Sequence, residues 1–316
     1  MTTEQTAPYP GTVARSQPLD WDPELTEEQW RQIEAQYRRG HSFGMENLES
    51  VDRYVLFAHE YRPDALKTFK NWVYAVADGR GLDQPVPGMI AGALIMLHYY
   101  CVIRYPQGIR YETNGPRAQG IKKSEIADIV ALAWLSAGPF GINSAAAQLY
   151  DVMQEWDDSD APGWKWPEGW AHDPEAFRSG IDFARSNDER SIAPDDLEKL
   201  TDWHRRVEGA VPAYVPFLAR HYPLALKAFR HRMESTLAHG SLPKQYVALA
   251  WVHLAASWWR PEALQRAIHM ARVFGVTKDQ VVHVLGLTQV YQGHVGMDAV
   301  VEAVGDALDR WDRAPA

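Results

Sequence analysis

Apolar residues recur at three- and four-residue spacing along most of this chain, which is the pattern of helices that bury one face. The segment 26–40 begins with a capping box, in which Thr26 is followed three residues later by Gln29, and predicts a first helix. The segment 47–77 predicts one or two more helices, and 87–105 is apolar on all sides, as expected of a central helix. Almost no segment shows the two-residue alternation of a half-buried strand, so the sequence predicts an all-α protein.

The second half of the chain repeats the first. The pattern Y-V-x-F that begins at Tyr54 recurs 160 residues later, as does the pattern P-x-A-L-K-x-F that begins at Pro63. A shortening by five residues then changes the offset to 155, which holds without further gaps. Residue pairs at this second offset include His98 and His253, Pro106 and Pro261, Gly120 and Gly275, and Lys123 and Lys278. We therefore predict two tandem helical bundles related by internal duplication.

The repeat divides the chain into four predicted parts. They are a flexible arm at 1–24, a first helical repeat at 25–150, a connecting segment at 151–194 and a second helical repeat at 195–316. The connecting segment is rich in Pro, Gly and Asp and contains four closely spaced tryptophans: Trp156, Trp164, Trp166 and Trp170. Two interpretations are open, a strap whose indoles pack on the surface of one repeat and a lid over a ligand pocket.

Composition narrows the class of protein. Apolar residues make up 46% and charged residues 23% of the 316 residues, and the net charge of −9 gives no general attraction to nucleic acid or anionic membranes. A single cysteine, Cys101, excludes an intrachain disulfide framework and cysteine-rich metal sites. The N-terminus lacks the pattern of a signal peptide, and no run of 18 apolar residues occurs. We expect a soluble, cytoplasmic protein with no nucleic-acid or membrane partner.

The second repeat contains an apolar helix, a short turn, a helix that ends A-x-x-x-G-V-T-x-D-Q, and another apolar helix. The residues that carry this pattern are Ala271, Gly275, Val276, Thr277, Asp279 and Gln280, with Gln119, Gly120, Ile121 and Glu125 in the matching segment of the first repeat. Over about two helices and their joint in each copy, the chain resembles the carboxymuconolactone decarboxylase and AhpD-like superfamily. The resemblance implies two AhpD-like bundles. Because single-copy members form rings of dimers or trimers, it also implies a homo-oligomer, either a dimer or a trimer.

The resemblance further indicates which chemistry to expect. Peroxidase members carry a redox Cys-x-x-Cys, but the matching positions hold Arg260 and Ala263 in the second copy and Tyr105 and Gly108 in the first. Thiol peroxidase chemistry needs a reactive thiolate and a resolving thiol, so we exclude that activity. The decarboxylase branch relies on acid–base groups and cationic side chains, and we predict the same here, with no cofactor and no metal.

Two histidines, His98 and His253, stand inside otherwise apolar helices at equivalent places of the two repeats. A histidine on an apolar face is commonly a core residue with one partner, whereas titratable groups in apolar helices are also where acid–base sites arise. Both interpretations are open. Under the second, Glu112 or His269 would be the proton-transfer partner. The carboxylate of a substrate would be bound or enclosed by residues near the joints between helices: Arg104, Arg110, Tyr111, Asn114, Arg266, Tyr99 and Trp258.

These residues predict a cofactor-independent lyase or isomerase, similar to a decarboxylase, that acts by acid–base chemistry on a small carboxylated or enolisable organic acid. The alternative is a non-catalytic AhpD-like helical scaffold that binds a small ligand or a protein partner. An enclosed pocket in which His and Arg converge would favour the enzyme. Histidines held in a dry core would favour the scaffold.

Overall fold

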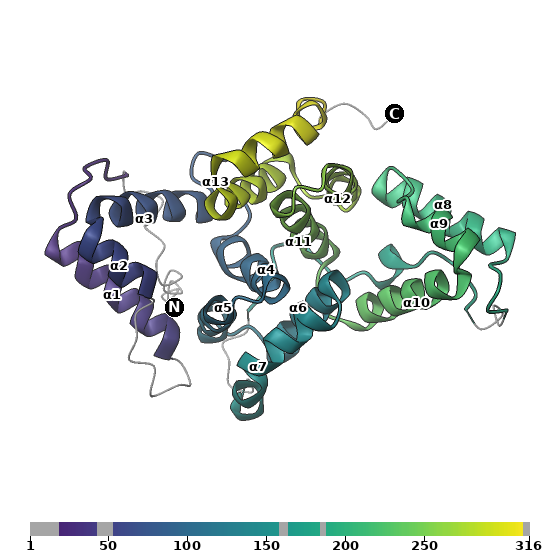
Figure 1. The fold of residues 1–316 in the computed structure, drawn as a ribbon, viewed down its shortest axis with the longest axis horizontal. Helices are drawn as coiled ribbons and strands as arrows, with labels where there is room; N and C mark the ends of the chain where they lie inside the picture. The colour runs from purple at the N-terminus through teal and green to yellow at the C-terminus, as the bar shows by residue number, and fades with distance from the viewer. Residues whose placement is uncertain (1–18, 43–52, 158–163, 184–187, 312–316) are drawn as a thin grey trace, which may run out of the picture. The chain divides into compact units, whose positions relative to one another are not determined.

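The protein is helical throughout the part of the chain that the computed structural model describes, residues 19–42, 53–157, 164–183 and 188–311 (Figure 1). Thirteen α-helices lie in these ranges, together with one π-helix and one 3₁₀-helix, and no strand is present there. The predicted all-α fold is confirmed. None of the helices in the described ranges is long and apolar enough to cross a membrane.

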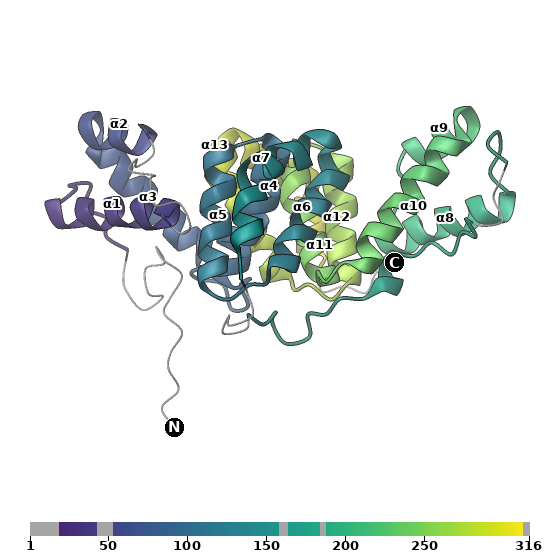
Figure 2. The ribbon, with the colours of Figure 1, turned by 90° about the horizontal axis from the view of Figure 1, so that it is seen from below.

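The chain divides into two compact units, Met1–Lys165 and Trp166–Ala316. The helices of the first unit are α1 (Glu27–Ser42), α2 (Arg53–Tyr61), α3 (Pro63–Ala77), α4 (Ile95–Ile103), α5 (Pro106–Ala118), α6 (Lys123–Ala137) and α7 (Pro139–Glu155). A π-helix at Ile90–Leu94 leads directly into α4, in which all residues but the last are buried, as predicted. This helix contacts α5, α6 and α7, and Figure 2 shows the four as neighbours. The core of the first unit is therefore centred on α4.

Local chemistry sets the helix boundaries that the sequence predicted at the start of the chain. The backbone N–H of Thr26 donates to Oε1 of Gln29 (3.1 Å), and the backbone N–H of Gln29 donates to Oγ1 of Thr26 (3.3 Å), which completes the predicted capping box. Pro63 lacks an N–H and therefore begins α3 rather than continuing α2. At the other end of the unit, α7 extends to Glu155, so the first residues of the predicted connecting segment are helical.

The second unit has the same order of helices around α11. Its helices are α8 (Pro194–Glu208), α9 (Tyr214–His221), α10 (Pro223–His239), α11 (Lys244–Ser257), α12 (Pro261–Val273) and α13 (Lys278–Asp309), preceded by a 3₁₀-helix at Pro174–Phe177. The buried helix α11 contacts α12 and α13, and α8 contacts α12. Within α13, Gly293 takes non-helical angles (φ 68°, ψ −168°) and turns the helix. In the order of helices along the chain, the first half of α13 therefore corresponds to α6 of the first unit. The second half of α13 corresponds to α7.

Backbone details recur in the two units at the offset of 155 residues. The bounds of α5 and α12 differ by this number at both ends, and α6 and α13 begin at equivalent residues. Left-handed or related positive φ angles also recur in pairs: Arg104 and Trp259, Gly120 and Gly275, Gly138 and Gly293. Positive φ at a bulky residue is uncommon, so the first of these pairs is the most informative. These coincidences support internal duplication, which we keep as a proposal.

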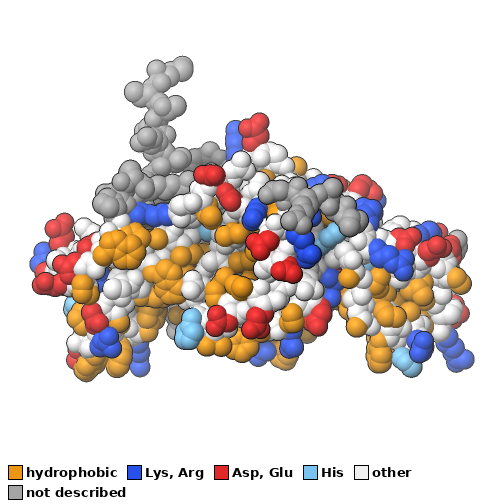
Figure 3. Space-filling model, turned by 90° about the horizontal axis from the view of Figure 1, so that it is seen from above, with side chains coloured by type: hydrophobic (Ala, Val, Ile, Leu, Met, Phe, Trp, Pro, Cys, Tyr) orange, Lys and Arg blue, Asp and Glu red, His pale blue; other side chains and the backbone are white. Residues whose placement is uncertain are grey.

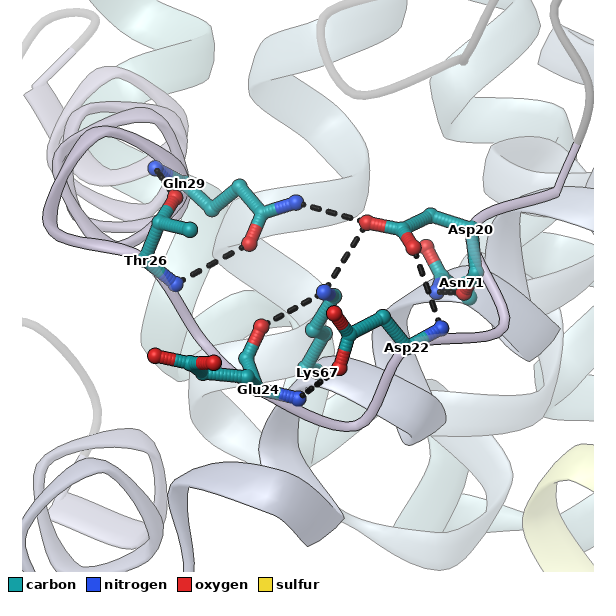
Figure 4. Close-up of polar contacts among 7 residues, drawn as sticks. All are labelled: Asp20, Asp22, Glu24, Thr26, Gln29, Lys67 and Asn71. Carbon is teal, nitrogen blue, oxygen red and sulfur yellow. Dashed lines mark hydrogen bonds and ion pairs between the residues drawn. The ribbon is translucent and has the colours of Figure 1, made fainter.

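A buried lysine fastens the segment that precedes the first helix of each unit. In the first unit, Nζ of Lys67 lies 2.9 Å from a carboxylate oxygen of Asp20 and donates to the carbonyl of Glu24 (Figure 4). The hydrogen bond from Lys67 is the main reason why the pKa of Asp20 is lowered. In the second unit the equivalent Lys227 donates to the carbonyls of Asp188 and Ser191. The part of the predicted flexible arm that the structure describes is thus bound to α3, and residues 1–18 lie outside the described residues.

The tryptophans of the connecting segment pack on their own units. Trp156 is buried, with the Arg117 guanidinium 5.1 Å from its ring centroid, and the backbone N–H of Trp164 donates to the carbonyl of Gly120. In the second unit, the rings of Trp166 and Trp170 are stacked with centroids 6.4 Å apart. The ring of Trp166 also packs against Tyr246 of α11, at 5.4 Å. These contacts favour the strap over the lid, because the indoles of Trp156, Trp166 and Trp170 each pack against another side chain.

Large apolar side chains lie on the surface of both units. Phe57 on α2 is 63% exposed, and the equivalent Phe217 on α9 is 61% exposed. Figure 3 shows hydrophobic side chains among charged ones on the face that it draws. Contiguous apolar surface is commonly covered by another protein chain. The homo-oligomer stays a prediction, and α2 and α9 supply apolar side chains that an interface could cover.

Candidate functional site

His98 lies in the apolar core of the first unit. Its ring is fully buried, and Nε2 lies 3.1 Å from Oγ of Ser136 on α6. The Ser136 hydroxyl donates to the carbonyl of Leu132 (2.9 Å), so its oxygen accepts from His98 and the imidazole proton is assigned to Nε2. Burial lowers the pKa of His98 to about 3, which keeps the ring neutral. Its hydrogen bond joins it to Ser136 and not to Glu112, the predicted partner.

This buried histidine makes the stability of the fold depend on pH. Below its ordinary pKa of 6.5 the unfolded chain takes up a proton on His98, whereas the folded chain does so only near pH 3. The folded state therefore loses stability as the pH falls from 6.5 towards 3, at about 1.4 kcal/mol per pH unit. His98→Gln keeps an N–H donor for Ser136 and should remove this loss. Between pH 7.5 and 5, the wild type should lose about 2 kcal/mol more than the variant, measured by urea unfolding.

A matched control for this measurement is His294→Gln, which changes an exposed histidine on α13. It should follow the pH profile of the wild type. Parallel profiles for the wild type and His98→Gln would contradict the buried, neutral ring.

The remaining predicted residues of the first unit lie in separate environments. Arg104 is exposed at the end of α4, and its guanidinium carbon lies 4.1 Å from the centroid of the Phe140 ring. The side chain of Arg104 therefore stacks at the surface, whereas His98 lies in the core. The buried members of the predicted set are Tyr99, Glu112 and Asn114, and the half-buried members are Arg110 and Tyr111. The described contacts do not bring Arg104 and His98 into one site.

His253 occupies the equivalent place in the second unit. It is fully buried on α11, and its ring packs edge-on against Tyr291 of α13, with centroids 6.3 Å apart. Tyr291 corresponds to Ser136 at the offset of 155, so each histidine meets a polar side chain from an equivalent helix. Trp258 is exposed at the end of α11. Both histidines are fully buried in apolar helices.

Cys101 is buried in α4, one turn after His98. Burial raises the pKa of its thiol to about 12. At neutral pH the group is a protonated thiol, which is a poor nucleophile.

Two other predicted residues, Arg266 and His269, lie in a polar cluster where α8 meets α12. Glu208, the last residue of α8, holds two partners with Oε2: Nδ1 of His204 at 3.0 Å and Nε of Arg266 at 3.5 Å. His269 packs against Gly209, where a Cβ would come within 2.8 Å of its Nδ1. Gly209 also has φ 75°, so glycine is required there for two reasons. We call Glu208, His204, Arg266 and their neighbour Tyr214 the Glu208 cluster.

Tyr214 extends the Glu208 cluster from α9. Its ring centroid lies 6.3 Å from that of His204. Tyr214 is 37% exposed as a whole, but desolvation of its hydroxyl raises the pKa of that group to about 12, with a further contribution from the charge of Glu208. The phenol of Tyr214 therefore stays protonated. It lies near the Glu208 carboxylate, which accepts a hydrogen bond from His204 and pairs with Arg266. Such a set can accept a proton, bind an anionic group and donate a proton.

A cavity of about 330 Å³ lies at the joint between α11 and α12, closed on one side by the second half of α13. Its apolar walls are made of aliphatic residues, most of them alanines: Ala255, Ala256, Leu264, Ala299, Val300 and Ala303. Trp259, Arg260 and Glu302 also line it. Trp259 has φ 52°, and its indole Nε1 lies 3.2 Å from where a Cβ on Gly296 would be, so the indole lies close to α13. Non-glycine residues in such backbone conformations cluster at functional sites.

A positive and a negative side chain, Arg260 and Glu302, line this cavity without forming an ion pair with each other. The Arg260 guanidinium and the Glu302 carboxylate form no ion pair with each other or with other described residues, and both residues are exposed. Arg260 is also the N-cap of α12, next to the backbone N–H groups that begin a helix of 13 residues. A free guanidinium beside a helix N-terminus attracts anionic groups. The cavity therefore combines an apolar interior with one positive and one negative side chain at its edge.

Comparisons of the chain with protein-family models, curated proteins and solved structures found no match. The resemblance to the carboxymuconolactone decarboxylase and AhpD-like superfamily therefore rests on the residues of this chain alone. Within the described ranges, no three His, Cys, Asp or Glu side chains gather in a way that could hold a metal ion.

Sequence reasoning predicted Arg266 but missed the other members of the Glu208 cluster, and it missed the cavity at Arg260 and Glu302. The i, i+4 spacing of His204 and Glu208 was a usable signal for a paired acid and base on one helix face. Arg260 follows two tryptophans and precedes a proline that begins a helix. This pattern predicts a joint between two helices but gives no sign of a cavity there. Glu302 lies about 40 residues further along the chain, and only folding brings it to the same cavity.

Proposed function

We propose that this protein binds a small monocarboxylic acid in the cavity at the joint between α11 and α12. The observation that carries the proposal is an apolar cavity of about 330 Å³ with an arginine on its wall, Arg260, that forms no ion pair with the described residues. Ligand sites are commonly concave and apolar, with a few polar groups that fix the orientation of the ligand. The full burial of His98 and His253 further favours a binding scaffold over an enzyme that uses these histidines.

Charge defines the class of acid. Arg260 can bind one carboxylate in bidentate fashion, aided by the N-terminus of α12. Glu302 lines the same cavity and repels a second negative charge. The ligand is therefore an acid with one carboxylate and an apolar body that fills the space beside Ala255 and Val300.

The test is a thermal-shift comparison of the whole chain with small monocarboxylic acids, their neutral amides and dicarboxylic acids of equal length. At ten times its Kd, a ligand stabilises the fold by about 1.4 kcal/mol, which corresponds to a rise in Tm of about 2–4 °C. We expect this rise with monocarboxylates and smaller shifts with the amides and dicarboxylates. Equal shifts with acids and amides, or no shift with any acid, would contradict the proposal.

The Glu208 cluster favours a second candidate function, the predicted lyase or isomerase. Arg266 is a predicted carboxylate-binding residue, and its Nε lies 3.5 Å from Glu208. In this candidate function Glu208 removes a proton next to the substrate carboxylate, Arg266 binds that carboxylate, and Tyr214 donates a proton to the developing oxyanion. The support for it is the convergence of these groups from α8, α9 and α12.

A further inference from the structure

Two residues that line the cavity of the second unit correspond, at the offset of the proposed duplication, to aromatic residues of the first unit. At the offset of 155, Ala255 corresponds to Tyr100 and Arg260 to Tyr105. Leu264, also on the cavity wall, corresponds to the buried Ile109, which is similar in size. The change from Tyr100 to Ala255 removes a whole ring from the wall of the cavity, whereas Arg260 and Tyr105 are similar in volume and differ in charge.

The packing of Tyr100 shows what those positions accommodate. Tyr100 is buried, and its ring meets that of Tyr105 edge-on, with centroids 5.2 Å apart. It lies directly on α5 at Gly108, where an added Cβ would come within 2.4 Å of Cδ2 of Tyr100. The residue equivalent to Gly108 in the second unit is Ala263. In the first unit a glycine thus makes room for a ring, and in the second unit that ring is missing.

From this comparison we infer that the acid bound in the second unit carries a single aromatic ring, which occupies the space that the Tyr100 ring fills in the first. The inference rests on the proposed function. It adds the chemical class of the ligand, an arylacetate-like monocarboxylic acid. An apolar cavity of about 150 Å³ already holds benzene, so 330 Å³ accommodates a ring with a short carboxylated side chain.

The walls of the cavity suit such a ligand. Ala255, Ala256 and Val300 provide apolar surface, and Trp259 on the same wall can pack against an aromatic ring, as Tyr105 does against Tyr100. Arg260 replaces Tyr105, so a cation stands where the first unit has a neutral phenol. The change from Tyr100 to Ala255 therefore opens the space for a ring, and the change from Tyr105 to Arg260 supplies the charge for a carboxylate.

The experiment measures the Kd of phenylacetate and of cyclohexylacetate by isothermal titration calorimetry on the full chain. The two acids have equal numbers of carbon atoms, but only phenylacetate has a planar ring. We expect phenylacetate to bind roughly 2- to 10-fold more tightly, as aromatic packing implies. The double variant Ala255→Tyr/Ala263→Gly rebuilds the packing of the first unit inside the cavity and should weaken phenylacetate binding at least about 10-fold. Ala263→Gly alone is the matched control and should bind like the wild type.

The outcomes separate this inference from the proposed function. Equal binding of the two acids, with loss of both in the double variant, would overturn the aromatic class and leave the monocarboxylate site standing. Failure of both acids to bind the wild type would overturn both. Phenylacetate binding that the double variant leaves unchanged would place the ligand outside this cavity and also overturn both. The comparison of the two acids uses the wild type alone, so it decides the aromatic class even if the double variant does not fold.

Discussion

Replacing Arg260 by Met should weaken the binding of a small monocarboxylic acid by roughly 10- to 100-fold, since a hydrogen bond to a charged group contributes about 1.5–3 kcal/mol. Methionine keeps an unbranched apolar stem but removes the guanidinium. Because Arg260 has no ion pair in the described structure, the substitution leaves no other charge unpaired. The loss is therefore expected in affinity and not in stability, measured as Kd by titration calorimetry and as Tm without ligand.

The control for this variant is Arg206→Met. Arg206 is an exposed arginine on α8 that does not line the cavity. It should retain the affinity of the wild type. If both variants lost affinity to the same extent, the effect would come from the net charge of the chain rather than from a carboxylate bound at Arg260.

Glu208→Gln should slow proton exchange next to a carboxylate by roughly 10²–10⁴-fold, the usual contribution of a general base. The reaction to follow is the uptake of deuterium from D₂O at the carbon beside the carboxylate of small enolisable acids, observed by NMR. Glutamine still accepts hydrogen bonds from His204 and Arg266 but cannot take up the proton. Circular dichroism would confirm that the helical fold is kept.

Glu198→Gln is the matched control for this measurement, because Glu198 is an exposed glutamate on the same helix. Its exchange rate should equal that of the wild type. An exchange rate in the wild type no higher than without protein, or an equal rate in Glu208→Gln, would end the lyase or isomerase candidate.

Much of the fold could be predicted because its determinants are local. Pro106 and Pro261 begin α5 and α12 at the first helical position, where proline is favoured. The continuous apolar run around His98 predicted a central helix, and α4 is buried on all sides. The offset of 155 was visible in the sequence and is matched by the bounds of α5 and α12. Such features depend on neighbouring residues along the chain.

The candidate sites could not be predicted in the same way, because they depend on side chains from distant helices. The imidazole of His98 could have pointed towards Glu112, but the fold gives it Ser136 from α6. The cavity exists because small residues of α11 and α13 face each other, and no spacing within one helix indicates this. The change from Tyr100 to Ala255 was present in the aligned repeats, but its meaning required the position of the Tyr100 ring.

The most direct test of the central claim is a crystal structure of the protein with bound phenylacetate. The account predicts the acid in the cavity between α11, α12 and α13, with its carboxylate on Arg260 and its body against Ala255 and Val300. An acid bound instead between Arg266 and Tyr214 of the Glu208 cluster, or no bound acid at a concentration well above Kd, would contradict it.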